Sequence, residues 1–152
     1  MADQNDKKKM GTKKNFMRNY GNIYKNILVR LKSPRKPESG DIVHFGYPKS
    51  SNEKKPYYLL IHDDGTYWTG ITLNWISPKD LVKLASQMQL SIRTSDFSKV
   101  INQNDAYDLY HAEIKRWMKD NGINAWRQYF KSEIVSPTIY YVDRNAIDKY
   151  LR

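Results

Sequence analysis

The sequence predicts an α+β protein: a small, partly open β-barrel of the SH3-like kind, with a helical insertion and an N-terminal amphipathic helix. Three observations lead to this prediction. Three strand-like runs follow one another between residues 41 and 73, two helix-like segments come next, and a last strand-like run ends near residue 142. Strands, then helices, then a strand is an order typical of a small α+β domain. The length of 152 residues suits one such domain.

The N-terminal region divides into a tail, a helix and a linker. Residues 1–14 are polar, which predicts a disordered basic tail. Apolar residues then recur every three or four positions, which predicts a basic amphipathic helix over residues 15–32. This apolar face consists of Phe16, Tyr20, Ile23, Ile27 and Leu31. Prolines at 34 and 37 end the helix, so residues 15–37 form a helix and linker before a single α+β domain over residues 38–152.

Three strands begin the predicted domain. Residues 41–45, 57–62 and 66–73 are rich in β-branched, aromatic and other apolar side chains. The sequence Asp63-Asp64-Gly65 separates the last two runs and predicts a hairpin, because glycine tolerates the positive φ of tight turns. Gly70 predicts a bulge or sharp bend, such as small barrels use at their corners.

The helical insertion follows the third strand. Ser77 before Pro78 is typical of a helix start. A longer helix is expected from a cap at Asn104 to about residue 119, and Gly122 provides its C-terminal cap.

The C-terminal region is predicted to contain a turn, a strand and a helix. Trp126, Tyr129 and Phe130 are assigned to a short helical turn. Residues 139–142 predict the closing strand, and Asp143 is expected to cap a terminal helix.

The positive charge is concentrated near the N-terminus. The chain has 26 Lys and Arg against 16 Asp and Glu, a net charge of +10. Residues 1–36 hold eleven of the basic and two of the acidic residues, a net charge of +9, so the rest of the chain carries only +1. The eleven are Lys7, Lys8, Lys9, Lys13, Lys14, Arg18, Lys25, Arg30, Lys32, Arg35 and Lys36.

This asymmetry predicts a polyanionic partner. Basic residues that displace counterions from phosphates bind the nucleic-acid backbone without reading its sequence. Nucleic acid is the commonest polyanion, and we expect the partner to be the phosphate backbone of DNA. An acidic membrane surface or an acidic protein would respond to the same charge. The plain structural alternative is a solvated tail that improves solubility.

Aromatic side chains offer a second way to hold nucleic acid. Phe, Trp and Tyr make up 13% of the residues. On a small barrel, Tyr57, Tyr67 and Trp68 are candidates for base stacking, as in proteins that bind single strands. The structural alternative is that aromatic residues on strands fill the core.

The sequence gives few signals for catalysis or cofactors. The absence of cysteine excludes thiolate zinc sites and cysteine nucleophiles, and no glycine-rich phosphate loop is present. His62 precedes Asp63 and Asp64, but neighbouring strand residues point to opposite faces and the aspartates are explained by the turn. We therefore predict no catalytic residue, metal ligand or cofactor, and a protein that is not an enzyme.

The segment 40–78 resembles a group of small tailed-bacteriophage proteins. In this group, a G-x-x-x-x-F-x-Y-x-P-K stretch, a P-Y-Y stretch and an N-L-x-Y-L-x-P stretch follow in order. The corresponding stretches here run from Gly40 to Lys49, from Pro56 to Tyr58 and from Gly70 to Pro78, with Trp75-Ile76 in place of Tyr-Leu. Residues 126–129 resemble a later Y-R-x-Y element. The resemblance implies a virus-encoded protein of virion assembly or phage DNA and indicates no catalytic residues.

A weaker resemblance is to toxin ribonucleases of the MazF/PemK type. These proteins also begin with Gly-Asp before an apolar strand of an SH3-like barrel. Here Lys55-Pro56 stands where that family has Arg-Pro, and no clear acid or base partner follows. The resemblance implies a ribonuclease as an alternative function.

We therefore expect a phage-type protein that binds the nucleic-acid backbone non-specifically through its N-terminal arm and contacts other virion or assembly proteins. The alternatives are a purely structural neck, connector or baseplate protein and the toxin-type ribonuclease. No apolar run reaches the roughly 18 residues of a membrane helix, and the Lys-rich start lacks the apolar core of a secretory signal. We expect no membrane association, and a location in the host cytoplasm or the virion. The sequence leaves the oligomeric state open.

Overall fold

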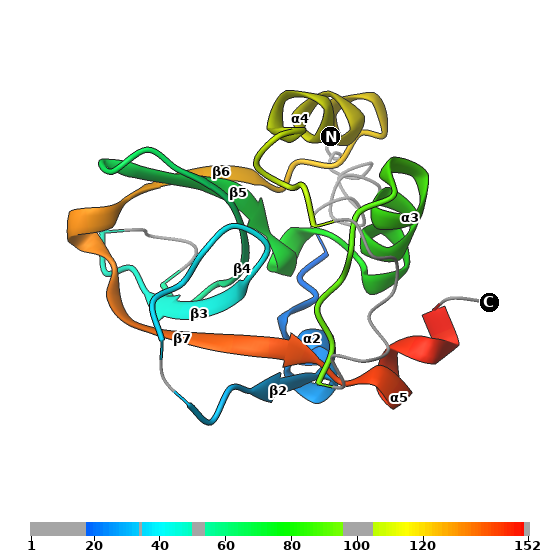
Figure 1. The fold of residues 1–152 in the computed structure, drawn as a ribbon, viewed down its shortest axis with the longest axis horizontal. Coiled ribbons are helices and arrows are strands. Elements are labelled where there is room, and N and C mark those ends of the chain that lie inside the picture. The colour runs from blue at the N-terminus through cyan, green and yellow to red at the C-terminus, as the bar shows by residue number, and fades with distance from the viewer. Residues whose placement is uncertain (1–17, 34, 50–53, 96–104, 151–152) are drawn as a thin grey trace, which may run out of the picture.

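The structure, a computed structural model, describes residues 18–33, 35–49, 54–95 and 105–150 (Figure 1). The strands are β2 (Leu28–Arg30), β3 (Ile42–Gly46), β4 (Tyr57–Asp63), β5 (Tyr67–Thr72), β6 (Trp126–Phe130) and β7 (Val135–Val142). The α-helices are α2 (Gly21–Ile27), α3 (Pro78–Met88), α4 (His111–Asp120) and α5 (Arg144–Ile147). Short 3₁₀ helices are η1 (Leu73–Trp75), η3 (Lys131–Glu133) and η4 (Asp148–Tyr150).

The six strands form one antiparallel sheet in the order β2-β7-β3-β4-β5-β6. The predicted α+β class is therefore confirmed. The edge strands β2 and β6 do not pair with each other, so the sheet is not closed into a barrel. Figure 1 shows the α-helices gathered on one side of the molecule, with the strands extending away from them.

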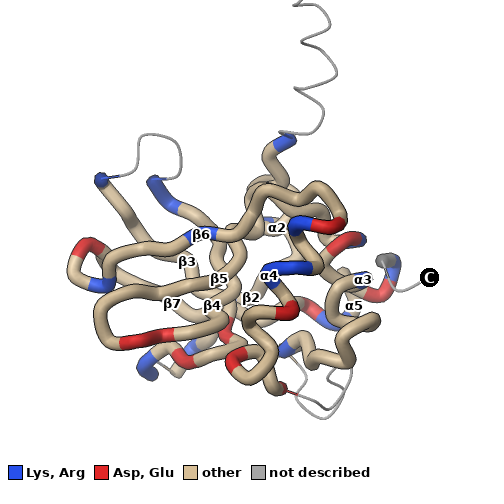
Figure 2. The backbone as a smooth tube through the Cα atoms, turned by 90° about the horizontal axis from the view of Figure 1, so that it is seen from above, with Lys and Arg blue, Asp and Glu red and all other residues tan. Residues whose placement is uncertain are grey.

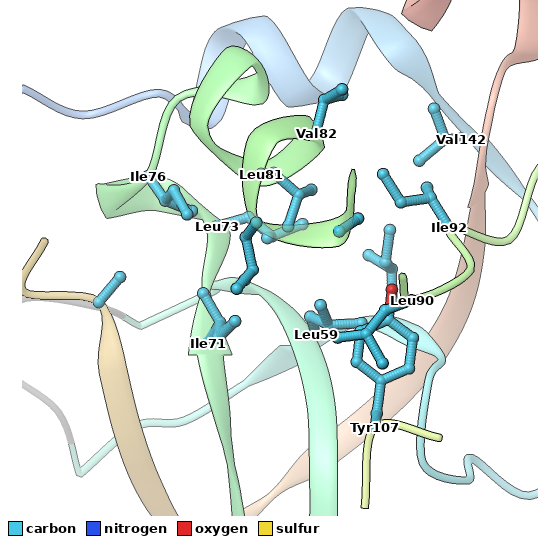
Figure 3. Close-up of a cluster of buried hydrophobic side chains, with 14 of the residues drawn as sticks. Leu59, Ile71, Leu73, Ile76, Leu81, Val82, Leu90, Ile92, Tyr107 and Val142 are labelled. Atoms are coloured by element: carbon cyan, nitrogen blue, oxygen red, sulfur yellow. The ribbon is translucent and has the colours of Figure 1, made fainter. Parts of the chain in front are cut away.

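Both faces of the sheet carry a hydrophobic cluster. The larger cluster joins the sheet to the helices: Figure 3 shows Leu59 and Ile71 of the sheet together with Leu81 of α3. The opposite face holds a smaller and more aromatic cluster, whose buried members are Val43, Phe45, Tyr58, Leu60, Trp68 and Tyr129. Two buried faces follow from the alternation of side chains along each strand, and they explain why β4 reads as a continuous apolar run.

The helix predicted over residues 15–32 is shorter where the structure describes it. Helix α2 ends at Ile27, and Leu28–Arg30 form a strand instead. Pairing with β7 outweighs the helical pattern, since Leu31 N–H donates to Ile139 O at 2.8 Å and Asp143 N–H donates to Ile27 O at 2.7 Å. Tyr24 and Ile27 are buried in the larger cluster, so α2 packs against the sheet as part of the same folded unit.

The helical turn predicted at Trp126, Tyr129 and Phe130 is wrong. These residues form β6 and pair with β5 in regular antiparallel register. Aromatic side chains suit a pleated surface, and Tyr129 is buried while Phe130 is exposed, which is the alternation of a strand. Strand β7 also begins earlier than predicted, at Val135.

Several local signals are confirmed. The Ser77 hydroxyl accepts from Asp80 N–H at 3.0 Å at the start of α3, and the Asp143 carboxylate accepts from Asn145 N–H at 3.0 Å at the start of α5. Gly122 follows α4 with φ +67°. The register of β4 and β5 shifts opposite Gly70, where a bulge was expected. Asn104, the predicted cap of the second helix, lies outside the described residues.

Candidate nucleic-acid interface

The eleven predicted backbone-binding residues fall into two groups. Lys7, Lys8, Lys9, Lys13 and Lys14 lie outside the described residues. The other six are described and exposed: Arg18, Lys25, Arg30, Lys32, Arg35 and Lys36. Figure 2 marks the Lys and Arg positions along the described backbone in blue. Arg18 precedes α2, Lys25 lies on α2, Arg30 lies on the edge strand β2, and the other three lie on the segment that leads to β3.

Four of these six cations have no carboxylate partner among the residues that the structure describes: Lys25, Arg30, Lys32 and Lys36. The Arg18 guanidinium lies 5.3 Å from the centre of the Tyr20 ring, a cation–π contact that leaves its charge in place. An unpaired exposed cation keeps its counterions until a phosphate replaces them, so these positions suit backbone binding.

A groove of about 530 Å³ runs beside β2 and the first half of β7. Val29, Leu31 and Ile139 supply apolar lining, while Arg30 and Lys32 bring positive charge to it. The combination of an apolar floor and a basic rim can accept the sugar of a nucleotide together with its phosphate.

Arg35 differs from the other cations because its guanidinium is already paired with a carboxylate. Its guanidinium donates to both carboxylate oxygens of the fully buried Asp41, at 2.8 and 2.7 Å. The hydrogen bond to Asp41 is the main reason why the pKa of Arg35 lies above its ordinary value. Arg93 donates to the same carboxylate at 2.6 Å and also contacts Asp105. Arg35 therefore anchors residues 30–36, which we call the basic segment, to the sheet.

Three rings form a half-buried aromatic platform on the helix-facing side of the sheet: Tyr57 on β4, His44 on β3 and Tyr140 on β7. His44 and Tyr57 are partners in the ladder and their rings stack, with centroids 4.1 Å apart. Tyr140 meets both rings edge-on, at 6.0 Å from His44 and 5.9 Å from Tyr57. Burial, followed by the nearby Tyr140, raises the pKa of Tyr57 above its ordinary value. Its phenol is therefore neutral near pH 7 and brings no negative charge to the platform.

The three predicted stacking residues lie in different places. Tyr57 belongs to the aromatic platform. Tyr67 is half-buried at the opposite end of the β4–β5 hairpin, with its ring 4.6 Å from that of Phe130. Trp68 is only 5% exposed and packs edge-on against Phe45 in the smaller cluster, so its burial does not fit the predicted role.

The structure also brings together two histidines that the sequence separates by 49 positions. His62 Nδ1 lies 2.7 Å from Asp108 Oδ1, and the ring of His111 stacks on that of His62 at 5.4 Å. His111 Nδ1 lies 2.9 Å from the carbonyl oxygen of Asp108. Both Nδ1 atoms are thus engaged, which leaves both Nε2 atoms for a ligand. No spacing in the sequence indicates this arrangement, because it depends on how α4 is placed beside the hairpin.

In the described part of the chain, no group of three or more His, Asp and Glu side chains is arranged to hold a metal ion. None of the described helices has both the length and the apolar character that crossing a membrane requires. The chain matches no protein-family model, no curated protein and no solved structure.

Proposed function

We propose that this protein binds the nucleic-acid backbone. Because residues 40–78 resemble small tailed-bacteriophage proteins, we propose that it does so on phage DNA or during virion assembly. The observation that carries the proposal is the set of exposed cations on the β2 edge and its continuation: Arg30, Lys32 and Lys36. None of them is neutralised by a carboxylate of the described residues. The predicted tail would add five lysines to the same end of the chain.

The anchored position of this segment supports the proposal. Asp41 holds Arg35, and β2 is hydrogen-bonded to β7, so Arg30 lies on a fixed strand and Lys32 lies between that strand and the anchored Arg35. Cations on a fixed element lose less conformational entropy on binding than cations on a free tail. Such contacts hold the backbone without reading bases.

The purely structural alternative has a different requirement. A neck, connector or baseplate role through the N-terminal helix needs an apolar stripe that is free to insert between subunits. Tyr24 and Ile27 of α2 are instead buried in the chain's own core. This use of α2 supports the nucleic-acid proposal over insertion into a neighbour.

The sheet supports a finer proposal about the fold. We infer a widely opened relative of an SH3-like barrel, because the β3-β4-β5-β6 meander pairs its first strand with the last strand, β7. The helices η1, α3 and α4 then form the insertion between β5 and β6.

A second candidate function, cleavage of RNA, is favoured by the His62–Asp108–His111 arrangement. A carboxylate that holds one ring nitrogen leaves Nε2 able to act as a general base, and a second imidazole nearby can act as the acid. The test is incubation of the full chain with RNA in the presence of EDTA. Cleavage that is lost in His62→Ala and retained in Asp120→Asn, an exposed change on α4, would support this candidate, whereas intact RNA would reject it.

The backbone-binding proposal is tested with two variants of equal net charge. Arg30→Gln/Lys32→Gln/Lys36→Gln removes the proposed cations, and Lys83→Gln/Lys115→Gln/Lys119→Gln removes three exposed lysines of α3 and α4. Affinity for duplex DNA is measured by fluorescence anisotropy at low salt. We expect a loss of about tenfold or more for the first variant and a much smaller loss for the second. Equal losses would contradict a site at β2.

Truncation is a poor substitute for these variants. Removing residues 1–36 would take away β2 and also Tyr24 and Ile27, so lost binding could reflect lost folding. Substitutions in the full chain keep the sheet intact.

A further inference from the structure

We propose that the aromatic platform of Tyr57, His44 and Tyr140 stacks the bases of single-stranded nucleic acid while Arg30 holds the adjoining phosphate. This inference rests on the proposed backbone binding and adds the class of strand that the protein prefers. The platform includes one of the three residues that the sequence marks for stacking, and two that it does not.

Ladder register places the platform next to the basic edge. Arg30 and Tyr140 are Cα partners across β2 and β7, so both side chains lie on the same face of the sheet. Tyr140 is in turn the partner of Ile42 on β3. Two residues farther along β3, and therefore on the same face, His44 pairs with Tyr57 of β4. A strand that crosses the sheet from β2 to β4 would therefore meet a guanidinium first and the aromatic rings next.

A second cation, Arg18, is linked to the Tyr57 end of the platform through Tyr20 and Asn74. Asn74 accepts from Tyr57 N–H through its side-chain oxygen at 3.0 Å, and its backbone oxygen accepts from Tyr20 N–H at 2.7 Å. Tyr20 and Tyr57 are thus held beside the same residue, and the Arg18 guanidinium lies over the Tyr20 ring. Lys54 and Lys55, both exposed, immediately precede this end of β4. Arginines at both ends suit a ligand whose charge alternates with flat rings.

The ring arrangement is more than core packing. The buried rings of the smaller cluster, those of Phe45, Tyr58, Trp68 and Tyr129, are at most 5% exposed. Tyr57, His44 and Tyr140 are instead half-buried, and Tyr57 and Tyr140 pack at the margin of the larger cluster. A single strand can present its unpaired bases to such a surface, whereas a duplex keeps the faces of its bases stacked inside the helix.

Tyr67 provides a matched control within the same chain. It is also half-buried, and its ring also lies against an aromatic neighbour, Phe130, at an interplanar angle of 35°. It lies at the other end of β5, beside the hairpin, and no member of the basic segment is its ladder partner. Its replacement removes an aromatic ring of the same kind from a different place.

The experiment measures the affinity of the full chain for three labelled probes of about 20 nucleotides: oligothymidylate, oligouridylate and a DNA duplex. The variants are Tyr57→Leu/Tyr140→Leu, Tyr57→Phe/Tyr140→Phe and Tyr67→Leu, each checked for an unchanged circular dichroism spectrum. We expect the double leucine variant to bind single strands about tenfold more weakly and the duplex almost as before. The phenylalanine and Tyr67 variants should bind like the parent. The probe that shows the tenfold loss identifies DNA, RNA or both as the ligand.

A measurement on the unmodified chain covers the case in which the leucine variant does not fold. Bound oligothymidylate or oligouridylate should protect Tyr57 and Tyr140, but not Tyr67, from nitration by tetranitromethane. Salt-sensitive binding without this protection, or with an equal loss in Tyr67→Leu, would overturn the platform and leave the backbone proposal standing. No binding to any probe at low salt would instead reject the backbone proposal itself.

Discussion

Arg35 binds Asp41 in a bidentate manner: its two terminal nitrogens each donate to one carboxylate oxygen, at 2.8 and 2.7 Å. Asp41 is completely buried, and it also accepts from Glu38 N–H at 2.8 Å and from Arg93. A single carboxylate therefore ties the segment after β2, the start of β3 and the segment after α3 into one corner of the fold.

Replacing this carboxylate should be costly. Asp41→Asn keeps the shape of the side chain but removes the charge that two guanidinium groups share. We expect a loss of about 3 kcal/mol in the free energy of unfolding, because breaking a buried ion pair leaves its partners uncompensated. Chemical denaturation followed by circular dichroism measures this change. Asp120→Asn, an exposed change on α4, should leave stability unchanged, and an equal effect of the two variants would contradict this account.

Gly70 should tolerate no side chain. A Cβ at this position would overlap the carbonyl oxygen of Leu59 on the neighbouring strand. The chain is packed so closely there because the ladder shifts register opposite Gly70. We expect Gly70→Ala to lower the free energy of unfolding by about 3 kcal/mol, which thermal and chemical denaturation would detect.

Gly46→Ala is the matched control for that change. Gly46 also lies in a strand next to a register shift, but a Cβ there would approach Val135 only to 3.6 Å, an ordinary contact. Its effect should stay within about 1 kcal/mol. A similar loss for both variants would show that general strand propensity, and not the approach to Leu59, governs the two sites.

Local signals in the sequence predicted the fold better than periodicity did. Ser77, Asp143 and Gly70 act through their own hydrogen bonds or size, and the structure confirms what each indicated. The helical spacing held as far as Ile27 and failed over residues 28–31, because a free edge of β7 offered hydrogen bonds to Leu28–Arg30. Whether a short segment pairs with a distant strand depends on tertiary packing, which single-sequence patterns do not contain.

The acid side of the stability profile should depend on Asp63. Burial alone would raise its pKa, but the Gly65 N–H at 2.9 Å and Lys131 at 3.0 Å outweigh burial and hold the pKa below its ordinary value. A depressed pKa in the folded state means that this contribution is present above about pH 4 and is lost as the pH falls further.

We therefore expect Asp63→Asn to lower the melting temperature at pH 7 and to make it less sensitive to pH between about 5 and 2. Lys131→Met should change the profile in the same direction because it removes the ion-pair partner. A parent protein and an Asp63→Asn variant with parallel profiles would show that this carboxylate does not control acid unfolding.

The candidate site was only partly predictable. Composition located the cations, and Arg30 and Lys32 do lie at the exposed edge of the sheet. The position of Arg30 opposite Tyr140 was not predictable, because it requires the β2–β7 register. The same holds for His62 and Asp108, which are 46 positions apart and meet through the placement of the segment before α4.

The predicted tail and the β2 edge should contribute separately to salt dependence. Each phosphate that a cation contacts releases counterions, so a plot of log affinity against log salt falls by about 0.9 for each contact on duplex DNA. Changing Lys7, Lys8, Lys9, Lys13 and Lys14 together to glutamine should therefore make the slope shallower by up to about 4. Stability should not change, because the sequence predicts a disordered tail. Anisotropy titrations of duplex DNA between about 50 and 200 mM salt give the slope. If the slope of the variant equals that of the parent, the tail does not contact phosphates, and the described cations on β2 and in the following linker must account for the binding.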